Sequence, residues 1–130
     1  MDGTRREARE RAVSLLYEAE LKTQTPDEVL ADLPVPPEDF VVDLVSGVGK
    51  HQARIDELIG AHAIDWTLDR MAAVDRNILR LAVYELLHRP DVPSAVVLSE
   101  AVELATRYGT DESTRFVNGL LASVAKDVRG

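Results

Sequence analysis

Apolar residues recur every three or four positions along most of this chain, which is the spacing of one face of an α-helix. One such stripe occupies residues 4–22, and a broader one begins near residue 38 and continues to residue 59. Residues 74–87 are apolar on almost every side, a pattern typical of a buried central helix. Two further stripes cover residues 97–108 and 111–128. No segment shows the strict alternation of a β-strand, so the pattern predicts an all-α fold.

Prolines, a glycine and capping residues divide these helices. The proline-rich segment between the first two stripes leaves room for one short helix at residues 27–33, and a short helical turn is expected from Trp66. Pro37 is expected in the first turn of the helix that follows it, where proline is well tolerated. Gly109 is expected to end one helix and Thr110 to cap the next. The sequence therefore predicts about seven helices, of which five are long.

Composition narrows the class of protein. The chain has 130 residues, of which 45% are hydrophobic, so we expect residues 1–130 to form one domain with its own core. It has no cysteine, which excludes disulfides, zinc–thiolate sites and thiol nucleophiles. The charged start, MDGTRREARER, has no apolar signal region, and no apolar run is long enough to span a membrane. These features predict a cytoplasmic protein with no membrane contact.

Few residues could carry catalysis. The segment Ser46–Lys50 contains two glycines and a lysine, but it lies inside a helical pattern, so small residues for close helix packing are favoured over a phosphate loop. Glu85 and His88 have the Glu-x-x-His spacing of di-iron bundles, but those sites need a second such motif. No Ser/His/Asp arrangement is distinguishable from chance. We therefore expect no catalytic residue, no metal and no cofactor, which favours a binding module.

Charge is distributed unevenly along the chain. The net charge is −8, which by itself argues against binding to phosphates. Residues 23–65, however, carry nine acidic residues against Lys50 and Arg54, whereas residues 1–22 are balanced. The acidity is thus concentrated in one part of the chain, which would suit a basic ribosomal protein, and the two ends remain free to meet an anionic partner.

Arginines near the start of the chain, together with aromatic residues near its end, favour RNA. The first helix carries arginines at positions 5, 6, 9 and 11. Tyr108 stands at a helix end, and Arg115 and Phe116 lie one turn into the last helix. Single-stranded RNA is bound by stacking its bases on aromatic rings while guanidinium groups hold its phosphates. The alternative is a solvated arginine face paired with glutamates, with Phe116 in the core, and the pattern alone leaves this open.

Four sequence blocks, in order, carry a family resemblance. The block R-x-x-A-R-x-x-A-x-x-x-L-Y covers residues 5–17, and V-[ED]-[RK]-x-[IV]-L-R-[LI]-A-x-[YW]-E-L covers residues 74–86. The block D-V-P…E-A-[VI]-x-L-A covers residues 91–105, and acidic-Ser…F-V-N-G covers residues 111–119. With these blocks the chain resembles the NusB family of bacterial transcription antitermination factors along nearly its whole length.

The resemblance implies a fold, a function and partners. The expected fold is compact and all-helical, with two small bundles packed together. Family members bind the boxA element of ribosomal RNA leaders as a heterodimer with NusE, a small-subunit ribosomal protein, and this complex helps RNA polymerase ignore termination signals. RNA polymerase is thus an indirect partner, and some members also form homodimers.

The resemblance also implies roles for particular residues. Two sets of positions match the family's contact surfaces. The RNA-binding set is Arg5, Arg6, Arg9, Arg80, Tyr108, Glu112, Arg115 and Phe116. The set facing NusE is Tyr17, Asp75 and Arg76.

Two alternatives remain open from the sequence. The same helical module occurs at the N-terminus of ribosomal-RNA cytosine methyltransferases, although this sequence contains no glycine-rich cofactor-binding half. The other alternative is a metal-binding helical-bundle enzyme, which the missing second Glu-x-x-His motif disfavours.

Overall fold

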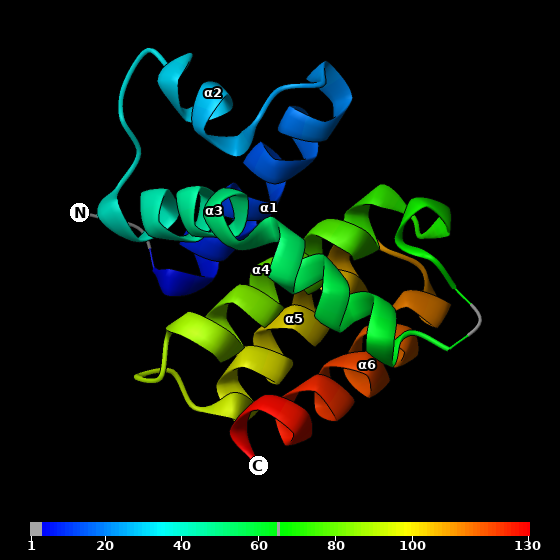
Figure 1. Cartoon of the computed structure of the whole chain (residues 1–130). Helices are drawn as coiled ribbons and strands as arrows, with labels where there is room; N and C mark the ends of the chain where they lie inside the picture. Colours follow the sequence, from blue (N-terminus) through cyan, green and yellow to red (C-terminus); the bar gives the residue numbers. More distant parts are fainter. Residues whose placement is uncertain (1–3, 65) are drawn as a thin grey trace.

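The structure is a computed structural model that describes residues 4–64 and 66–130, and within those ranges it has six α-helices, one 3-10 helix and no strand (Figure 1). The prediction of an all-α fold with about seven helices is therefore confirmed. None of these helices is long and apolar enough to cross a membrane. The elements in chain order are α1 (Arg5–Lys22), α2 (Pro26–Ala31), α3 (Asp39–His62), η1 (Leu68–Arg70), α4 (Ala73–His88), α5 (Ser94–Tyr108) and α6 (Asp111–Arg129).

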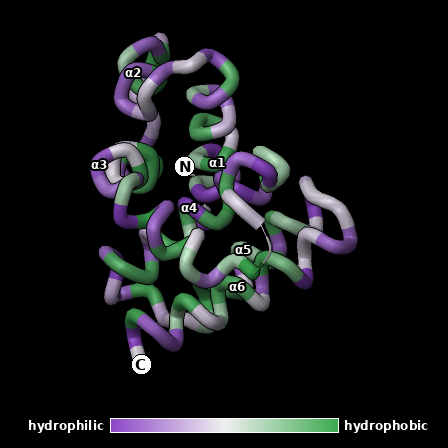
Figure 2. Tube along the Cα trace, turned by 45° about the vertical axis from the view of Figure 1, so that its right-hand side comes forward, coloured by the Kyte–Doolittle hydropathy of each residue, from purple (hydrophilic) through white to green (hydrophobic). Residues whose placement is uncertain are grey.

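The helices form two groups of three, and one helix of the second group also packs against the first group. In the first group α1, α2 and α3 contact one another, and in the second α4, α5 and α6 do so. Helix α4 also packs against both α1 and α3, which brings the two groups together (Figure 1). Hydrophobic and hydrophilic stretches alternate along the helices, as expected where each helix has one buried face (Figure 2). The predicted arrangement of two small bundles is confirmed.

Local sequence explains most helix ends. Thr4, Thr25 and Thr110 each accept a hydrogen bond from the backbone N–H three residues on, and the side chain at that position accepts one from the threonine's own backbone N–H. The predicted cap at Thr110 is therefore confirmed. The expected position of Pro37 is wrong, because Glu38 is the cap residue of α3 in an extended conformation, so Pro37 precedes the helix.

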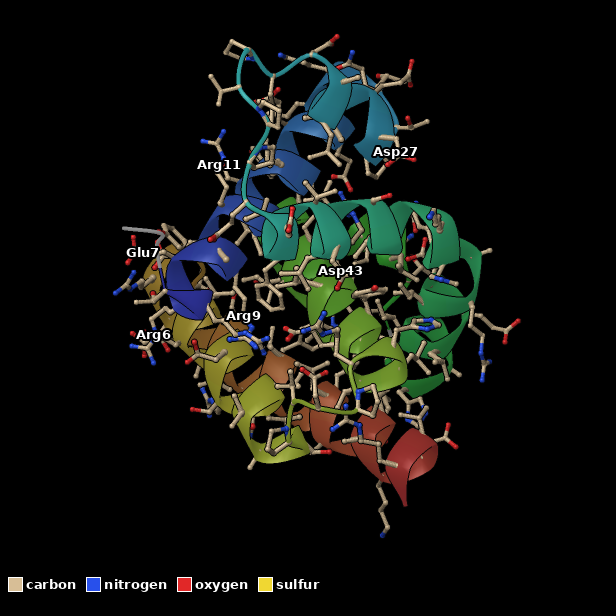
Figure 3. The ribbon with its side chains drawn as sticks, turned by 90° about the vertical axis from the view of Figure 1, so that its left-hand side faces the viewer. Arg6, Glu7, Arg9, Arg11, Asp27 and Asp43 are labelled. Atoms are coloured by element: carbon tan, nitrogen blue, oxygen red, sulfur yellow. The ribbon has the colours of Figure 1, made fainter. Side chains whose placement is uncertain are left out.

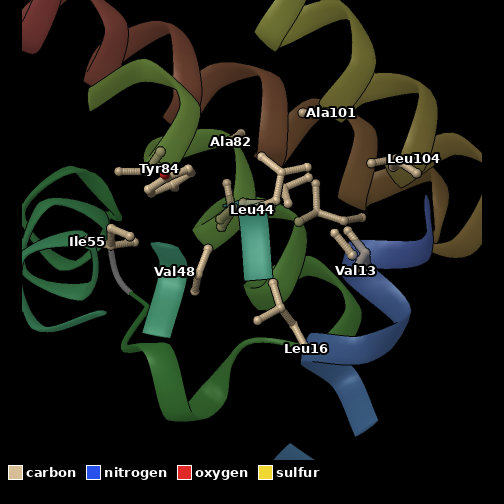
Figure 4. Packing of buried hydrophobic residues seen from close by; sticks show 14 of the residues in the cluster. Val13, Leu16, Leu44, Val48, Ile55, Ala82, Tyr84, Ala101 and Leu104 are labelled. Carbon is tan, nitrogen blue, oxygen red and sulfur yellow. The ribbon is translucent and has the colours of Figure 1, made fainter. Parts of the chain in front are cut away.

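Apolar residues from both groups meet in one core. Figure 4 shows how side chains from α1, α3, α4 and α5 converge there. Helix α4 contributes the most buried residues, as its apolar pattern predicts. Those labelled in the figure are Val13, Leu16, Leu44, Val48, Ile55, Ala82, Tyr84, Ala101 and Leu104.

The glycines of the segment 46–50 are packing residues. The segment lies inside α3 and not after a strand. A Cβ atom on Gly47 would lie 2.2 Å from Cζ of Tyr84, so only glycine leaves room for that ring. A Cβ on Gly49 would meet Pro26 at 3.2 Å. The interpretation of these positions as small residues for close packing is confirmed.

Candidate nucleic-acid interface

The arginines of α1 are divided between the surface and the interior. In Figure 3 Arg6 and Arg11 point outward, whereas Arg9 lies between helices. Arg9 is only 4% exposed, and Glu85 of α4 is only 1% exposed. The two side chains form a bidentate ion pair with Nε–Oε2 and Nη2–Oε1 distances of 2.9 and 2.7 Å. Burial is the largest single influence on the pKa of Arg9 and lowers it, but the hydrogen bonds to Glu85 together with the negative charges of Glu85 and Glu100 leave the pKa raised. The sequence predicted that Arg9 contacts RNA phosphates. In the structure the hydrogen bonds of Arg9 are directed into the protein.

Arg5 and Arg6 remain exposed at the start of α1. Nη2 of Arg6 lies 2.8 Å from Oε2 of Glu100 in α5, and this hydrogen bond raises the pKa of Arg6 and lowers that of Glu100. The guanidinium carbon of Arg5 lies 4.5 Å from the centre of the Phe40 ring, and that of Arg89 lies 5.0 Å from the same centre. The guanidinium carbon of the buried Arg9 lies 5.5 Å from the same centre, so Phe40 packs against three arginines. This role could not be predicted from the sequence, because Phe40 belongs to the apolar stripe of its helix.

A glutamate of α1 joins this surface to the end of α5. The carboxylate of Glu10 accepts a hydrogen bond from the Tyr108 hydroxyl at 2.9 Å and another from Arg107. Tyr108 nevertheless leaves 52% of its area exposed. The structure therefore brings Arg6 and Tyr108 of the predicted set to the region where α1 and α5 meet, while Arg5 lies next to Arg6 in the chain and faces Phe40 and Asp91.

A second group of predicted residues lies at the start of α6. Glu112 and Arg115 are exposed, and Phe116 is partly buried against the core. Glu112 and Phe116 line a cavity of about 270 Å³ together with Asp75 of α4 and the half-exposed Trp66. Residues from the predicted RNA-binding set and one from the predicted partner set therefore meet at one cavity. Trp66 was not a predicted site residue, and only its exposure in the fold reveals it.

Three other predicted residues belong to a separate region between α1, α3 and α4. Arg80 pairs with Asp56 (Nε–Oδ1 2.8 Å) and with Glu20 (Nη1–Oε1 3.0 Å). Arg76 also pairs with Glu20, and the hydrogen bond from Arg76 is the main cause of the lowered pKa of Glu20. Tyr17 is partly exposed on α1, one turn before Glu20. Arg80 is thus held by carboxylates and is not grouped with the other predicted RNA-binding residues.

The structure brings together a row of Ser, His and Asp that the sequence did not distinguish from chance. Nδ1 of His62 lies 2.6 Å from Oγ of Ser123, and Nε2 lies 2.9 Å from Oδ2 of Asp127. Ser123 stands in the middle of α6, where backbone N–H groups are committed to the helix and provide no oxyanion hole. The row connects the end of α3 with α6 and has the character of a structural contact.

The Glu-x-x-His motif of α4 is divided between two environments. Glu85 forms an ion pair with Arg9, while the His88 ring stacks on the His51 ring with ring centres 4.0 Å apart. Burial and the neighbouring His51 lower the pKa of His88. Within residues 4–64 and 66–130 no three His, Cys, Asp or Glu side chains are grouped so that they could hold a metal ion.

Together these features define an all-helical protein whose candidate site is an exposed contact surface flanked by one small cavity. Residues 6–126 match the NusB family, and the chain belongs to that family. It is 50% identical over 129 residues to the transcription antitermination protein NusB of Salinispora arenicola, covering 94% of this chain and 95% of that one.

Solved structures agree with this assignment. The NusB structure of T. maritima superimposes with a TM-score of 0.86 at 35% identity, covering 98% of this chain and 94% of that one. A crystal structure of the antitermination factors NusB and NusE in complex with dsRNA contains a chain that superimposes with a TM-score of 0.80 at 30% identity. That match covers 95% of this chain and 96% of the other.

Proposed function

We propose that this chain is a transcription antitermination factor that binds boxA RNA of ribosomal RNA leaders together with NusE and so suppresses premature termination. Support comes from its membership of the NusB family and from its likeness to a protein solved with NusE and RNA. In this proposal the complex acts in the cytoplasm on elongating RNA polymerase, which the chain reaches only indirectly. We assign no catalytic step to it.

The observation that carries the RNA part is the meeting of α1 and α5. The exposed guanidinium group of Arg6 lies there with the half-exposed ring of Tyr108, which is held through Glu10, and the exposed Arg5 adjoins it at the start of α1. Such a surface can neutralise phosphates and stack an unpaired base. Glu112, Arg115 and Phe116, which follow Tyr108 across one short loop, would extend the contact along α6.

Two predicted RNA contacts take a different role in this proposal. Arg9 and Arg80 are each held by carboxylates of neighbouring helices. Arg9 would fix α1 against α4, and Arg80 would fix α4 against α3. Both would position the RNA-binding residues and would not touch phosphates.

The proposed surface for NusE includes Tyr17, Asp75 and Arg76. Tyr17 and Arg76 lie close to Glu20, where α1 meets α4, and Asp75 lies one residue before Arg76 in α4. An acidic chain of net charge −8 is a suitable partner for a basic ribosomal protein. Partner binding would also supply cations that this chain lacks, so RNA should bind more tightly to the heterodimer.

Fluorescence anisotropy with a labelled boxA RNA tests the proposal. We expect weak binding of boxA by the chain alone, tighter binding when NusE is added, and a clear preference over a scrambled RNA of equal length. Changing Tyr17→Asp should weaken NusE binding while leaving the binding of RNA to the isolated chain unchanged. Equal affinity for boxA and scrambled RNA, both with and without NusE, would refute the proposal.

A further inference from the structure

An arginine in the last turn of α6 directs its hydrogen bonds at one neighbouring segment. The partly buried Arg129 lies beside the end of α4 and the loop that leads into α5 (Figure 1). Its guanidinium group donates five hydrogen bonds of 2.7 to 3.1 Å, one to the hydroxyl of Ser94 and four to backbone carbonyls. Because a guanidinium has five N–H groups, its donors are all used within the protein. The four carbonyls belong to Glu85, Leu86, Arg89 and Val92.

The end of α4 needs donors from outside the helix. The last four carbonyls of a helix have no partners in the helix itself. The cap residue Arg89 has a φ of −122° and a ψ of 71°, so the left-handed glycine cap that closes many helices is not used here. Arg129 supplies donors to Glu85 and Leu86, and it places a positive charge where the helix dipole favours one. Helix α6 therefore caps helix α4.

The loop that Arg129 holds reaches the start of α1. Asp91 lies in the chain between Arg89 and Val92, whose carbonyls both accept hydrogen bonds from Arg129. Oδ2 of Asp91 lies 3.2 Å from Nη2 of Arg89 and 3.7 Å from Nη1 of Arg5. The place of this carboxylate, and so its contact with Arg5, depends on the loop backbone that Arg129 fixes.

Arg5 is oriented by α3 as well as by the loop. Its guanidinium carbon lies 4.5 Å from the centre of the Phe40 ring. The 3.7 Å contact with Asp91 is longer than a hydrogen bond, so it orients Arg5 without using its N–H groups. An exposed arginine loses rotamer freedom when it binds a ligand, and a side chain that is already oriented loses less. The two contacts thus prepare Arg5 to bind an anion.

We propose that Arg129 is a positioning residue for RNA binding, which it serves by fixing the loop between α4 and α5. Through that loop Asp91 orients Arg5 for contact with an RNA phosphate. The inference rests on the proposed function and adds to it a residue of α6 that acts on RNA without touching it. A substitution of Arg129 should therefore have the same effect on RNA binding as the loss of Arg5.

The salt dependence of RNA binding tests this role, because it reports the number of phosphates that the folded chain neutralises. We expect Arg129→Gln to bring the slope of log affinity against log salt about 0.7 closer to zero for single-stranded boxA RNA. Arg5→Gln should have the same effect, since the same phosphate contact is lost. The double variant should match either single variant, because both changes act through one residue.

Two further variants separate positioning from charge and from folding. Lys126→Gln removes an exposed cation from the same last turn of α6 and changes the net charge equally, and it should leave the slope unchanged. Arg129→Lys keeps the charge but lacks the planar five-donor group, so its slope should lie between those of the wild type and Arg129→Gln. Circular dichroism checks that each variant is folded. If Arg129→Gln is not, Arg129→Lys takes its place, with a smaller change in the same direction.

The orientation of Arg5 can also be measured without RNA. The δ-methylene protons of Arg5 adjoin the guanidinium group that lies over Phe40, so the ring shifts their NMR resonance. A chain with ¹³C-labelled arginine gives this resonance, which is assigned by its loss in Arg5→Gln. We expect it to move toward the value of an unstructured arginine in Arg129→Gln and to stay in place in Lys126→Gln.

Each outcome decides between the two proposals. If the wild-type chain binds no boxA RNA, with or without NusE, the proposed function fails, and the Arg5 resonance alone then decides whether Arg129 orients Arg5. If RNA binds but Arg129→Gln leaves the slope unchanged, only the positioning role is overturned. Additive effects of Arg129→Gln and Arg5→Gln would overturn it as well, because they would show two independent contributions. An equal change of slope in Lys126→Gln would do the same, in favour of a general effect of charge.

Discussion

At the scale of single residues, the ion pair between Arg9 and Glu85 is the most consequential contact. Both side chains are almost fully buried, and they join α1 to α4 by two hydrogen bonds. Removing one member of such a pair leaves a buried charge without its partner, and the cost is far larger than for a pair at the surface. In the proposed function, Arg9 would therefore affect RNA binding only by holding α1 in place.

This role predicts the effect of Arg9→Met. We expect the free energy of unfolding to fall by about 3–5 kcal/mol, because Glu85 would be left buried without a cation. Urea denaturation followed by circular dichroism measures the change. The matched control is Arg6→Met, whose own side chain is half exposed, and it should lower the stability far less than Arg9→Met. The double variant Arg9→Met/Glu85→Leu should recover most of the loss, and no recovery would contradict a mainly electrostatic origin.

The sequence could not distinguish these arginines. Positions 5, 6 and 9 carry the same residue type in one short helix, so each is equally plausible as a phosphate contact. The partner of Arg9 lies 76 positions further along the chain, and only the packing of α1 on α4 brings it close. The hydrogen bond from Ser113 to Asp75 could not be predicted for the same reason, because α4 and α6 meet only in the folded chain.

At the scale of helices, local sequence was far more informative. The capping residue Thr110, the end of α5 at Gly109 and the buried character of α4 were all predicted correctly, since these features depend on neighbouring residues. The physical reason for Gly109 was different from the one expected. Its φ of −104° is accessible to any residue, and the need for glycine arises because a Cβ would lie 2.7 Å from Ser113.

Two glycines inside helices should respond in opposite ways to alanine. Gly47→Ala would place a methyl group 2.2 Å from the Tyr84 ring, and we expect it to destabilise the protein by about 1–3 kcal/mol through overpacking. Gly119→Ala in α6 meets no atom within 4 Å and should stabilise the protein by about 0.5–1 kcal/mol through helix propensity. Thermal unfolding of both variants checks this. A stabilised Gly47→Ala protein would show that the α3–α4 contact can relax.

At the scale of the whole molecule, the net charge of −8 conceals a local surface suited to anions. Many of the cations are already paired within the protein, as Arg9, Arg76, Arg80 and Arg107 show. The acidic stretch is visible in the sequence, but composition could not show which arginines the fold holds in ion pairs between helices. The fold leaves Arg5, Arg6 and Arg115 exposed among the predicted contacts.

The number of exposed arginines among the predicted contacts sets the expected salt dependence of RNA binding. Each phosphate neutralised on a single strand contributes about −0.7 to the slope of log affinity against log salt, so three arginines predict a slope of about −2. Anisotropy titrations of boxA RNA with the isolated chain, at a series of KCl concentrations, measure this slope. Arg6→Gln should bring it about 0.7 closer to zero, because one phosphate contact is lost.

The control is Arg54→Gln, which removes an exposed arginine of α3 whose ion pair, within the described part of the chain, is with the neighbouring Glu57. It should leave the slope unchanged, although it alters the net charge by the same amount. Equal effects of the two substitutions would mean that RNA responds to the total charge of the molecule and not to a defined surface. A reduction confined to Arg6→Gln would locate the phosphate contacts at the start of α1, because salt dependence reports the phosphates that are neutralised.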